Sequence, residues 1–351
     1  MRSYIEINLK NLERNVRTIK ESLPAGFSYI SIVKADAYGH CMPQSLLRFL
    51  AGGADYFAVA NIYEASRIRE LVLDKPILVL SPILSVERNL VFEYDVTPAV
   101  STIEECEAFN ALAKAKDTKL KVHIKIDTGM GRMGVLHSEA VCFIKKVQLY
   151  DNLEIAGVFT HLSSADSNVE YTNKQLGIFR DIVLNFDRKG WLIHAHNSAG
   201  LAYLKADDVF NAVRVGLLQY GIIPNEEMLK LNVLPVMSFK AKVASVSLVE
   251  GKKLASISAG YADGVPADFA KGAVVLINGK ACPILGEVFM DECYADVSQL
   301  ENLKAGDEVV FIGTQGEECI DLHSYSLWTR RIPWETMVSI PTRVKRVLLC
   351  R

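Results

Sequence analysis

Short apolar runs that alternate with helical patterns constrain the fold of this chain more than any other feature. The apolar runs cover residues 29–33, 56–60, 77–80, 97–100, 121–126, 155–160, 191–195 and 212–215. Segments with helical spacing of apolar residues lie between them, for example 103–114 and 172–186. About eight strands alternating with helices are what a (β/α)8 barrel requires. We therefore expect an α/β fold in which residues 10–232 form a TIM-like barrel.

The pattern changes near residue 233, where short β-type runs separated by glycine-containing turns replace the alternation. These runs cover residues 238–248, 255–258, 273–276, 281–287 and 308–311. We expect residues 233–351 to form a mostly β domain, with a helix near 324–329 or near 333–338. Residues 1–9 alternate like a strand, and we expect this strand to join the second domain.

Composition argues against several classes of protein. A net charge of −2 over 351 residues is unlike a protein that binds nucleic acid by neutralising phosphates. No apolar run has the length of a membrane span, and the N-terminus lacks the apolar core of a signal peptide. The seven cysteines form no C-x-x-C pair, so neither a metal site nor a disulfide framework is indicated. We expect a cytoplasmic protein with no metal, no nucleic-acid partner and no membrane partner.

A lysine closes the first barrel run. Small and polar residues follow it directly, in the order Lys34-Ala-Asp-Ala-Tyr-Gly-His. In a parallel α/β fold, the carboxyl end of a strand opens onto the usual ligand site. A lysine there is costly to desolvate, so its pKa falls, and the neutral amine is a nucleophile toward carbonyl groups. Taken alone, however, a strand-end lysine more often extends its amine to solvent.

The motif at residues 34–40 resembles the lysine motif of the alanine racemase family, and the likeness covers nearly the whole chain. The resemblance implies a barrel followed by a β domain, with pyridoxal 5′-phosphate (PLP) as the cofactor and a small amino acid as the substrate. It implies that Lys34 is catalytic and carries PLP as a Schiff base. It also implies that Tyr38 helps to hold the phosphate.

A glycine-rich stretch at 125–134 follows another predicted strand. Its glycines let the backbone approach a ligand, and Arg132 can bind a carboxylate with two hydrogen bonds. Alone, this stretch would be a glycine turn with a solvated arginine. The resemblance implies that Arg132 binds the substrate carboxylate, and that Lys125 is a candidate for carbamylation.

Polar residues also follow the last three barrel strands. Many barrels bind phosphate at the last two, which end here near Ser198 and Arg214. The resemblance implies that Ser198 and the backbone amides of Gly216 and Leu217 hold the phosphate. It implies that His161, which alone would be a structural histidine, is catalytic beside the cofactor ring. It implies that Arg214 is catalytic too and faces the pyridine nitrogen, which keeps that nitrogen unprotonated and makes the ring a poorer electron sink.

Two motifs in the second domain also match the family, at 260–264 and 289–292. Taken singly, they would be a turn tyrosine and a loop acid. The resemblance implies that Tyr261, Met290 and Asp291 bind substrate in the active site of a partner subunit. A homodimer with shared sites is therefore expected.

The chain departs from the family at the second base. Racemisation removes a proton from one face of Cα and returns one to the other, which two bases do best. By resemblance, the second base is a tyrosine in a Tyr-Gly motif before residue 260. Residues 240–260 contain no tyrosine, so the second base is missing. Thr342 stands where the family has a phosphate-contacting tyrosine, which widens the pocket.

Three hypotheses follow for the function. The first is a PLP-dependent amino-acid racemase of the alanine racemase type, acting on alanine or a related amino acid. The second is a different PLP reaction on the same scaffold: decarboxylation, elimination or one-base exchange. The third is a non-catalytic relative that binds PLP.

Overall fold

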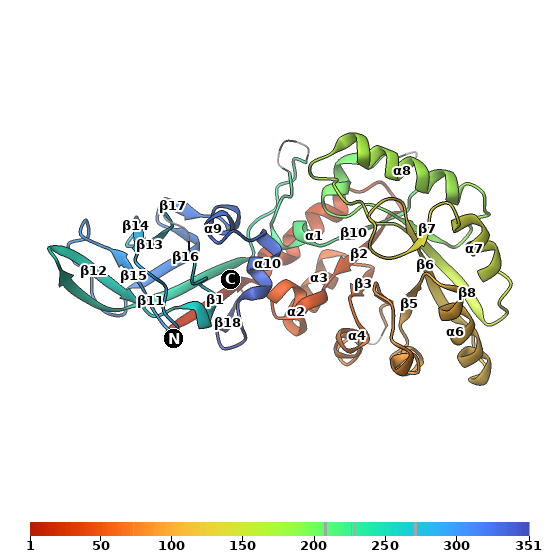
Figure 1. Ribbon diagram of the computed structural model, residues 1–351, viewed down its shortest axis with the longest axis horizontal. Helices are drawn as coiled ribbons and strands as arrows, with labels where there is room; N and C mark the ends of the chain where they lie inside the picture. The colour runs from red at the N-terminus through yellow and green to blue at the C-terminus, as the bar shows by residue number, and fades with distance from the viewer. Residues whose placement is uncertain (73, 207–208, 226, 228, 270–271, 351) are drawn as a thin grey trace. The chain divides into compact units, whose positions relative to one another are not determined.

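The computed structural model describes the whole chain except residues 73, 207–208, 226, 228, 270–271 and 351 (Figure 1). It divides into two compact units. The barrel unit contains Glu13–Ala37 and Pro43–Val233, and the β unit contains Met1–Leu12, Tyr38–Met42 and Leu234–Arg351. Among the described residues, no helix has both the length and the apolar content needed to cross a membrane.

Parallel strands form the centre of the barrel unit, and they confirm the predicted TIM-like barrel. The pairing order is β10 (Ala212–Val215), β2 (Ser28–Ile32), β3 (Tyr56–Val59), β4 (Ile77–Val79), β5 (Thr97–Val100), β6 (Leu120–Asp127), β8 (Leu153–Phe159) and β9 (Leu192–His194), with the short β7 (Val135–Leu136) beside β6. The amide of Asn211 donates to the carbonyl of Ile193 at 3.1 Å, and Arg214 to His196 at 2.9 Å. These bonds link the segments around β9 and β10, so the barrel is nearly closed.

Helices cover the outside of the barrel unit (Figure 1). They are α1 (Leu9–Ser22), α3 (Met42–Gly52), α4 (Ile62–Arg69), α5 (Leu90–Glu93), α6 (Ile103–Ala115), α7 (Ala140–Val147) and α8 (Val169–Val183), with the 3-10 turns η1 (Ser85–Glu87), η2 (Ala199–Tyr203) and η3 (Leu217–Tyr220). Side-chain caps fix where three of these helices, α4, α6 and α8, begin. Asn61, Thr102 and Asn168 each accept a hydrogen bond from an amide in the first turn of the helix that follows. The strands lie between these helices and the barrel interior, which explains their continuous apolar runs.

The β unit is mostly β, as predicted. Its strands are β1 (Ser3–Asn8), β11 (Met237–Val249), β12 (Lys252–Ile257), β13 (Val274–Ile277), β14 (Lys280–Leu285), β15 (Cys293–Asp296), β16 (Glu308–Gln315), β17 (Glu318–Ile320) and β18 (Lys345–Leu349), with η4 (Tyr261–Asp263), α9 (Leu322–Trp328) and α10 (Pro333–Ser339). Pairing runs from β11 through β12, β15, β14, β13 and β16, and β16 pairs with β11 again. The path therefore closes on itself. β1 pairs with β11 and with β18, so the first and last strands of the chain are neighbours.

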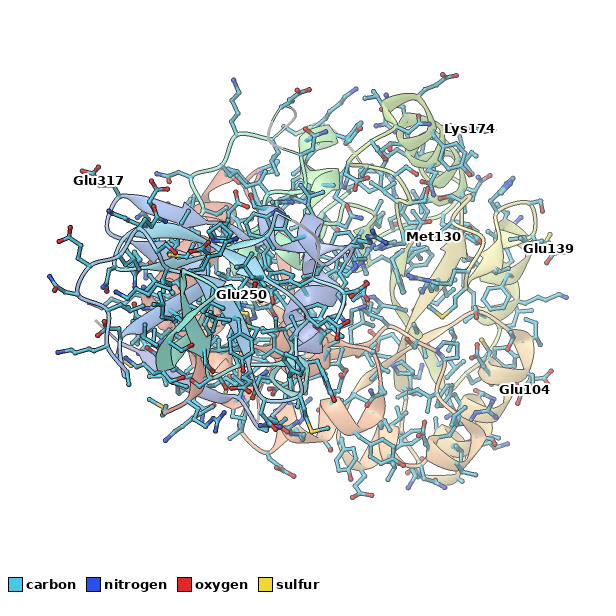
Figure 2. The ribbon with its side chains drawn as sticks, turned by 60° about the vertical axis from the view of Figure 1, so that its left-hand side comes forward. Glu104, Met130, Glu139, Lys174, Glu250 and Glu317 are labelled. Atoms are coloured by element: carbon cyan, nitrogen blue, oxygen red, sulfur yellow. The ribbon has the colours of Figure 1, made fainter. Side chains whose placement is uncertain are left out.

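A two-residue turn joins β11 to β12. The strands pair up to Val249 and Lys252, and only Glu250 and Gly251 lie between them. Both have positive φ, 48° and 78°, as a type I′ turn requires. Glu250 is labelled in Figure 2. Residues 240–257 thus form a hairpin with a tight turn and one register shift, between Val243 and Ser245.

The segment after Lys34 is a helical turn, α2 (Lys34–Gly39), and it winds with the left-handed twist. The four residues after Lys34 all have φ between 51° and 55°. Such a backbone costs about 1–2 kcal/mol per non-glycine residue. The amide of Ala37 donates to Val33 at 2.9 Å, and that of Ala35 to Glu64 Oε1 at 2.7 Å. The sequence predicts a loop here and not a helical turn. The pattern of apolar residues gives no information about the handedness of a single turn.

Asp36 provides a test of this handedness. At φ 55° the side chain is half exposed, so two truncations can be compared without disturbing a core. We expect Asp36→Gly to have a larger free energy of unfolding than Asp36→Ala, by about 1 kcal/mol, because only glycine adopts this φ without steric cost. In a right-handed helix the order would be reversed. Urea denaturation of the two variants measures the difference.

Candidate active site

The carboxyl ends of the barrel strands collect the residues that the sequence singles out. Lys34 follows β2, Lys125 lies near the end of β6, His161 follows β8, and Arg214 lies in β10. Because parallel strands of a barrel end on the same rim, these side chains share one face. Ser31 of β2 pairs with Val215 of β10, so the two strands are direct neighbours.

Neighbouring charges of both signs act on the pKa of the Lys34 amine. Burial lowers the pKa of Lys34 from its ordinary value, the nearby charge of Arg132 lowers it further, and Glu64 opposes this shift. Glu64 also fixes the backbone around the lysine. Its two carboxylate oxygens accept the amides of Ala35 and Ala60, at 2.7 and 2.9 Å. The result is a lysine that loses its proton more readily than usual, next to a backbone held in place.

Lys125 is a second buried amine on this rim, only 6% exposed. Its pKa falls to about 8, chiefly through burial and then through the charges of Arg132, Arg214 and Lys34, with Asp127 opposing. Its Nζ lies 5.6 Å from the centre of the Phe159 ring. At neutral pH a fraction of this amine is therefore uncharged and able to react.

Arg214 is the most enclosed cation of the site, at 3% exposure. Its Nη1 donates to the carbonyl of His194 at 2.8 Å, and its Nη2 to those of Thr160 at 2.6 Å and Ala195 at 3.2 Å. The guanidinium also lies 5.2 Å from the centre of the Phe159 ring. Burial lowers its pKa to about 9, but the surrounding carbonyl oxygens accept its protons and hold it in the charged form. Among the described residues, no carboxylate forms an ion pair with it.

Two buried histidines that the sequence analysis did not single out support Arg214. Arg214 Nη1 donates to His194 Nδ1 at 2.7 Å, and His194 Nε2 lies 3.0 Å from His123 Nδ1. Arginine has no acceptor, so Nδ1 of His194 must accept, and its proton must sit on Nε2 and point to His123. Burial and then Arg214 lower the pKa of both rings, that of His123 to about 3. The only sequence signal was a histidine in each of two predicted strands, 121–126 and 191–195, which form β6 and β9 on either side of β8.

His161 belongs to the same cluster. Its Nδ1 lies 3.5 Å from Arg214 Nη2. Burial lowers the pKa of His161 to about 3, and Arg214, Arg132 and the two lysines lower it in turn. The ring is therefore neutral at physiological pH and is a hydrogen-bonding group there, not a charged one.

Asp127 builds the loop that carries Arg132. Its Oδ1 accepts the amides of Gly129 and Met130, both at 2.8 Å, and its Oδ2 accepts that of Gly131 at 2.9 Å. Figure 2 labels Met130 in this loop. Three amides on one carboxylate fix a tight turn, and Arg132 extends from it with its side chain exposed. An exposed guanidinium on a fixed turn is suited to binding a carboxylate.

A polar cradle lies beside the last two strands. The oxygen of Ser198, itself 5% exposed, accepts the amides of Gly216 at 3.0 Å and Leu218 at 3.4 Å. A serine hydroxyl that accepts two amides still has its own proton to donate. Leu217 begins η3 next to it. The arrangement offers neutral hydrogen-bond donors for an anion.

The remaining predicted site residues lie in the β unit. The amide of Tyr261 donates to Phe289 at 2.9 Å, and that of Ala262 to Met290 at 3.0 Å, so the two predicted motifs are in contact. Asp291 accepts a hydrogen bond from Arg343 at 2.8 Å. Tyr38 also belongs to this unit, and burial raises its pKa to about 12.

Comparison with known proteins gives a consistent result over the whole chain. The models "Alanine racemase, N-terminal domain" and "Alanine racemase, C-terminal domain" match residues 7–224 and 236–348. The alanine racemase of Methylacidiphilum infernorum is 32% identical, over 98% of this chain and 92% of the relative.

Solved structures give the same result. The alanine racemase of Clostridium difficile 630 in complex with cycloserine has a TM-score of 0.91 at 30% identity, covering 99% of this chain and 96% of that one. The Bartonella henselae alanine racemase with covalently bound pyridoxal phosphate has a TM-score of 0.90 at 26% identity, covering 99% and 100%. Sequence and structure agree that this chain belongs to the alanine racemase family.

Proposed function

We propose that this protein is a PLP-dependent racemase that interconverts L- and D-alanine. The observation that carries the proposal is the cluster at the barrel rim, where burial and neighbouring cations lower the pKa of both Lys34 and Lys125. Membership of the family and full-length relatives named alanine racemase support alanine as the substrate.

The residues at the rim fit the cofactor. Lys34 supplies an amine that loses its proton readily, and Ser198 keeps a hydroxyl proton to donate to a phosphate oxygen. The amides of Gly216 and Leu217 border the same place, and we extend the proposal to the phenol of Tyr38. Bound PLP withdraws electrons from the Cα–H bond of an amino acid joined to it.

The side chains of this chain divide the remaining work. Lys34 would take the Cα proton on one face as the neutral amine or return one as the ammonium, and Arg132 would hold the substrate carboxylate with two hydrogen bonds. Arg214 would face the ring nitrogen of bound PLP and, because it cannot give up a proton, would leave that nitrogen unprotonated, which would limit electron withdrawal and favour simple proton exchange. Neutral His161, 3.5 Å from Arg214, acts as its hydrogen-bonding neighbour.

A homodimer with shared active sites is part of this proposal. Tyr261, Phe289 and Met290 expose 46%, 50% and 54% of their surface, although all are large and apolar. They lie together, because the backbone amide of Tyr261 donates a hydrogen bond to the carbonyl of Phe289. Exposed apolar clusters of this kind mark contact surfaces. We propose that a second copy covers them, and that Tyr261, Met290 and Asp291 reach substrate in its barrel.

We also propose a cytoplasmic location. All seven cysteines are free thiols, and three of them, Cys106, Cys282 and Cys293, are buried. Free thiols persist in reducing compartments.

One observation favours a second candidate function. The Glu250–Gly251 turn closes the hairpin where the family carries its second base. A site with Lys34 as its sole base would catalyse decarboxylation, elimination or proton exchange with retention. Incubation with L-alanine in D2O separates the candidates. A racemase forms D-alanine labelled at Cα, the second candidate releases CO2 or keeps the configuration, and a non-catalytic relative changes no amino acid.

Replacing Lys34 tests the central assignment. We expect Lys34→Ala to lose the visible absorption of lysine-bound PLP and to racemise alanine more than about 10²-fold more slowly, because the base and the point of attachment are both gone. Lys121→Ala, on the exposed face of β6, should behave as wild type. A wild-type protein that stays colourless with added PLP would contradict the assignment.

Lys125 gives a second prediction, that of carbamylation by CO2. Only the neutral amine reacts, so with its pKa near 8 the labelling rate at fixed dissolved CO2 rises about tenfold from pH 6 to pH 7 and levels off above pH 8. We expect a carbamate signal in 13C NMR with labelled CO2. It should vanish in Lys125→Met and persist in Lys121→Met, and its persistence in Lys125→Met would rule the site out.

The dimer is tested by its mass. We expect sedimentation equilibrium to give twice the chain mass of 38.9 kDa for wild type. Met290→Asp should shift the population toward monomer, because a charge would be buried at the interface. Leu149→Asp changes an apolar side chain that is 79% exposed in the barrel unit and should leave the mass unchanged. A monomeric wild type would refute the shared site.

A further inference from the structure

A hydrogen-bonded group of three side chains lies beside the exposed apolar cluster of the β unit. Ser256 Oγ donates to Glu292 Oε2 at 2.8 Å, and the phenol of Tyr294 donates to Glu292 Oε1 at 3.0 Å. Ser256 in β12 and Tyr294 in β15 are cross-strand partners, which aligns their hydroxyls with the carboxylate between them. Each oxygen of Glu292 is thus occupied by one hydroxyl.

Tyr294 adjoins the residues proposed to reach the partner's substrate. Its ring meets that of Phe289 edge to face, with centroids 6.1 Å apart and an interplanar angle of 87°. Phe289 accepts the amide of Tyr261 and donates its own amide to Glu292, both at 2.9 Å. Tyr294 is half-buried, so neighbouring residues hold its ring in place while part of the side chain stays accessible.

Other phenols of the β unit are less suited to proton transfer. Tyr4 also donates to a carboxylate, Glu308, but it is only 7% exposed. Tyr325 is 1% exposed. Among the described residues, the phenol of Tyr261 has no hydrogen bond to a carboxylate. Of Tyr4, Tyr261, Tyr294 and Tyr325 in the described part of the β unit, Tyr294 alone combines accessibility with a carboxylate that can receive its proton.

We propose that Tyr294, backed by Glu292, is the second proton-transfer group of the racemase, acting on the face of Cα opposite Lys34 in the partner's site. The inference rests on the proposed racemase and its dimer. It supplies the base that residues 240–260 lack, from the neighbouring strand.

Charge is conserved in the proposed proton transfer. The Cα–H bond breaks, its proton joins the oxygen of Tyr294, and the phenolic proton passes at the same time to Glu292. The electron pair stays on the substrate, and Lys34, as an ammonium, returns a proton to the other face. The reverse reaction runs through the same atoms. No free phenolate forms, which suits a site where the hydrogen bond to Glu292, and then burial, raise the pKa of Tyr294.

Isotope exchange tests the proposal. We expect Tyr294→Phe to racemise alanine at least about 10²-fold more slowly, while one enantiomer still exchanges its Cα proton for deuterium with retention through Lys34. Tyr150→Phe is the matched control, because burial and then Glu107 raise the pKa of that phenol too. Tyr150 lies in the barrel unit and not beside Phe289, so this variant should racemise alanine as wild type does. Unchanged racemisation in Tyr294→Phe would refute the inference and leave the racemase intact. A wild type that forms no D-alanine would refute the racemase itself.

A second variant separates proton transfer from a structural role. Glu292→Gln keeps the shape but cannot accept the phenolic proton. Racemisation should then depend on phenolate and rise about tenfold per pH unit from pH 7 toward pH 10, a slope absent in wild type. The titratable groups acting on Tyr294 are Glu292 and buried Cys293. Without PLP, 13C NMR of labelled tyrosine should show a lower pKa for Tyr294 in Glu292→Gln. An unchanged pKa and a flat profile would overturn the role of Glu292.

Mixed dimers test whether the group acts across subunits. Co-expressed Lys34→Ala and Tyr294→Phe chains form heterodimers with one intact site if Lys34 and Tyr294 come from different chains. We expect about half of wild-type activity in heterodimers purified through two tags. If each site used one chain alone, both sites would be defective and the heterodimer inactive, which would contradict the proposal.

Discussion

Crowding of positive charge at one rim of the barrel determines most of the chemistry. Lys34, Lys125, Arg132 and Arg214 act on one another or on His161 electrostatically. Among the described residues, none of these four cations forms an ion pair with a carboxylate. Burial, and then repulsion between these cations, lowers the pKa of both lysines toward the neutral amine and keeps His161 uncharged. An excess of cationic side chains at the rim also favours ligands with anionic groups, such as a phosphorylated cofactor and an amino-acid carboxylate.

Backbone strain accompanies this arrangement. The left-handed turn after Lys34 holds several non-glycine residues at positive φ, which is costly unless the surroundings impose it. Glu64 contributes to that constraint, because its carboxylate joins the amide of Ala35 to that of Ala60. The same carboxylate acts on the charge of Lys34. One side chain therefore influences both the position and the protonation of the amine.

The proposed role of Tyr294 would compensate for the side chain that residues 240–260 lack. The pairing of β12 with β15 places Ser256 directly opposite Tyr294, and Glu292 accepts a hydrogen bond from each of their hydroxyls. A phenol alone, with an ordinary pKa near 10, is a weak base at neutral pH. A phenol that can pass its proton to a carboxylate avoids that limit. The proposed division of labour places a neutral amine on one face of Cα and a phenol–carboxylate pair on the other.

The sequence by itself determined the barrel, the β unit and the strand-end positions of Lys34, Lys125 and Arg214, because apolar periodicity and the end of a strand are local properties. It also showed that residues 240–260 contain no tyrosine. Only the tertiary structure decided that His123 and His194 support Arg214, that α2 is left-handed, and that Glu292 joins Ser256 to Tyr294. Those contacts depend on strand register and handedness, which bring together residues that are distant in the chain or in different strands, and a single sequence carries no record of either.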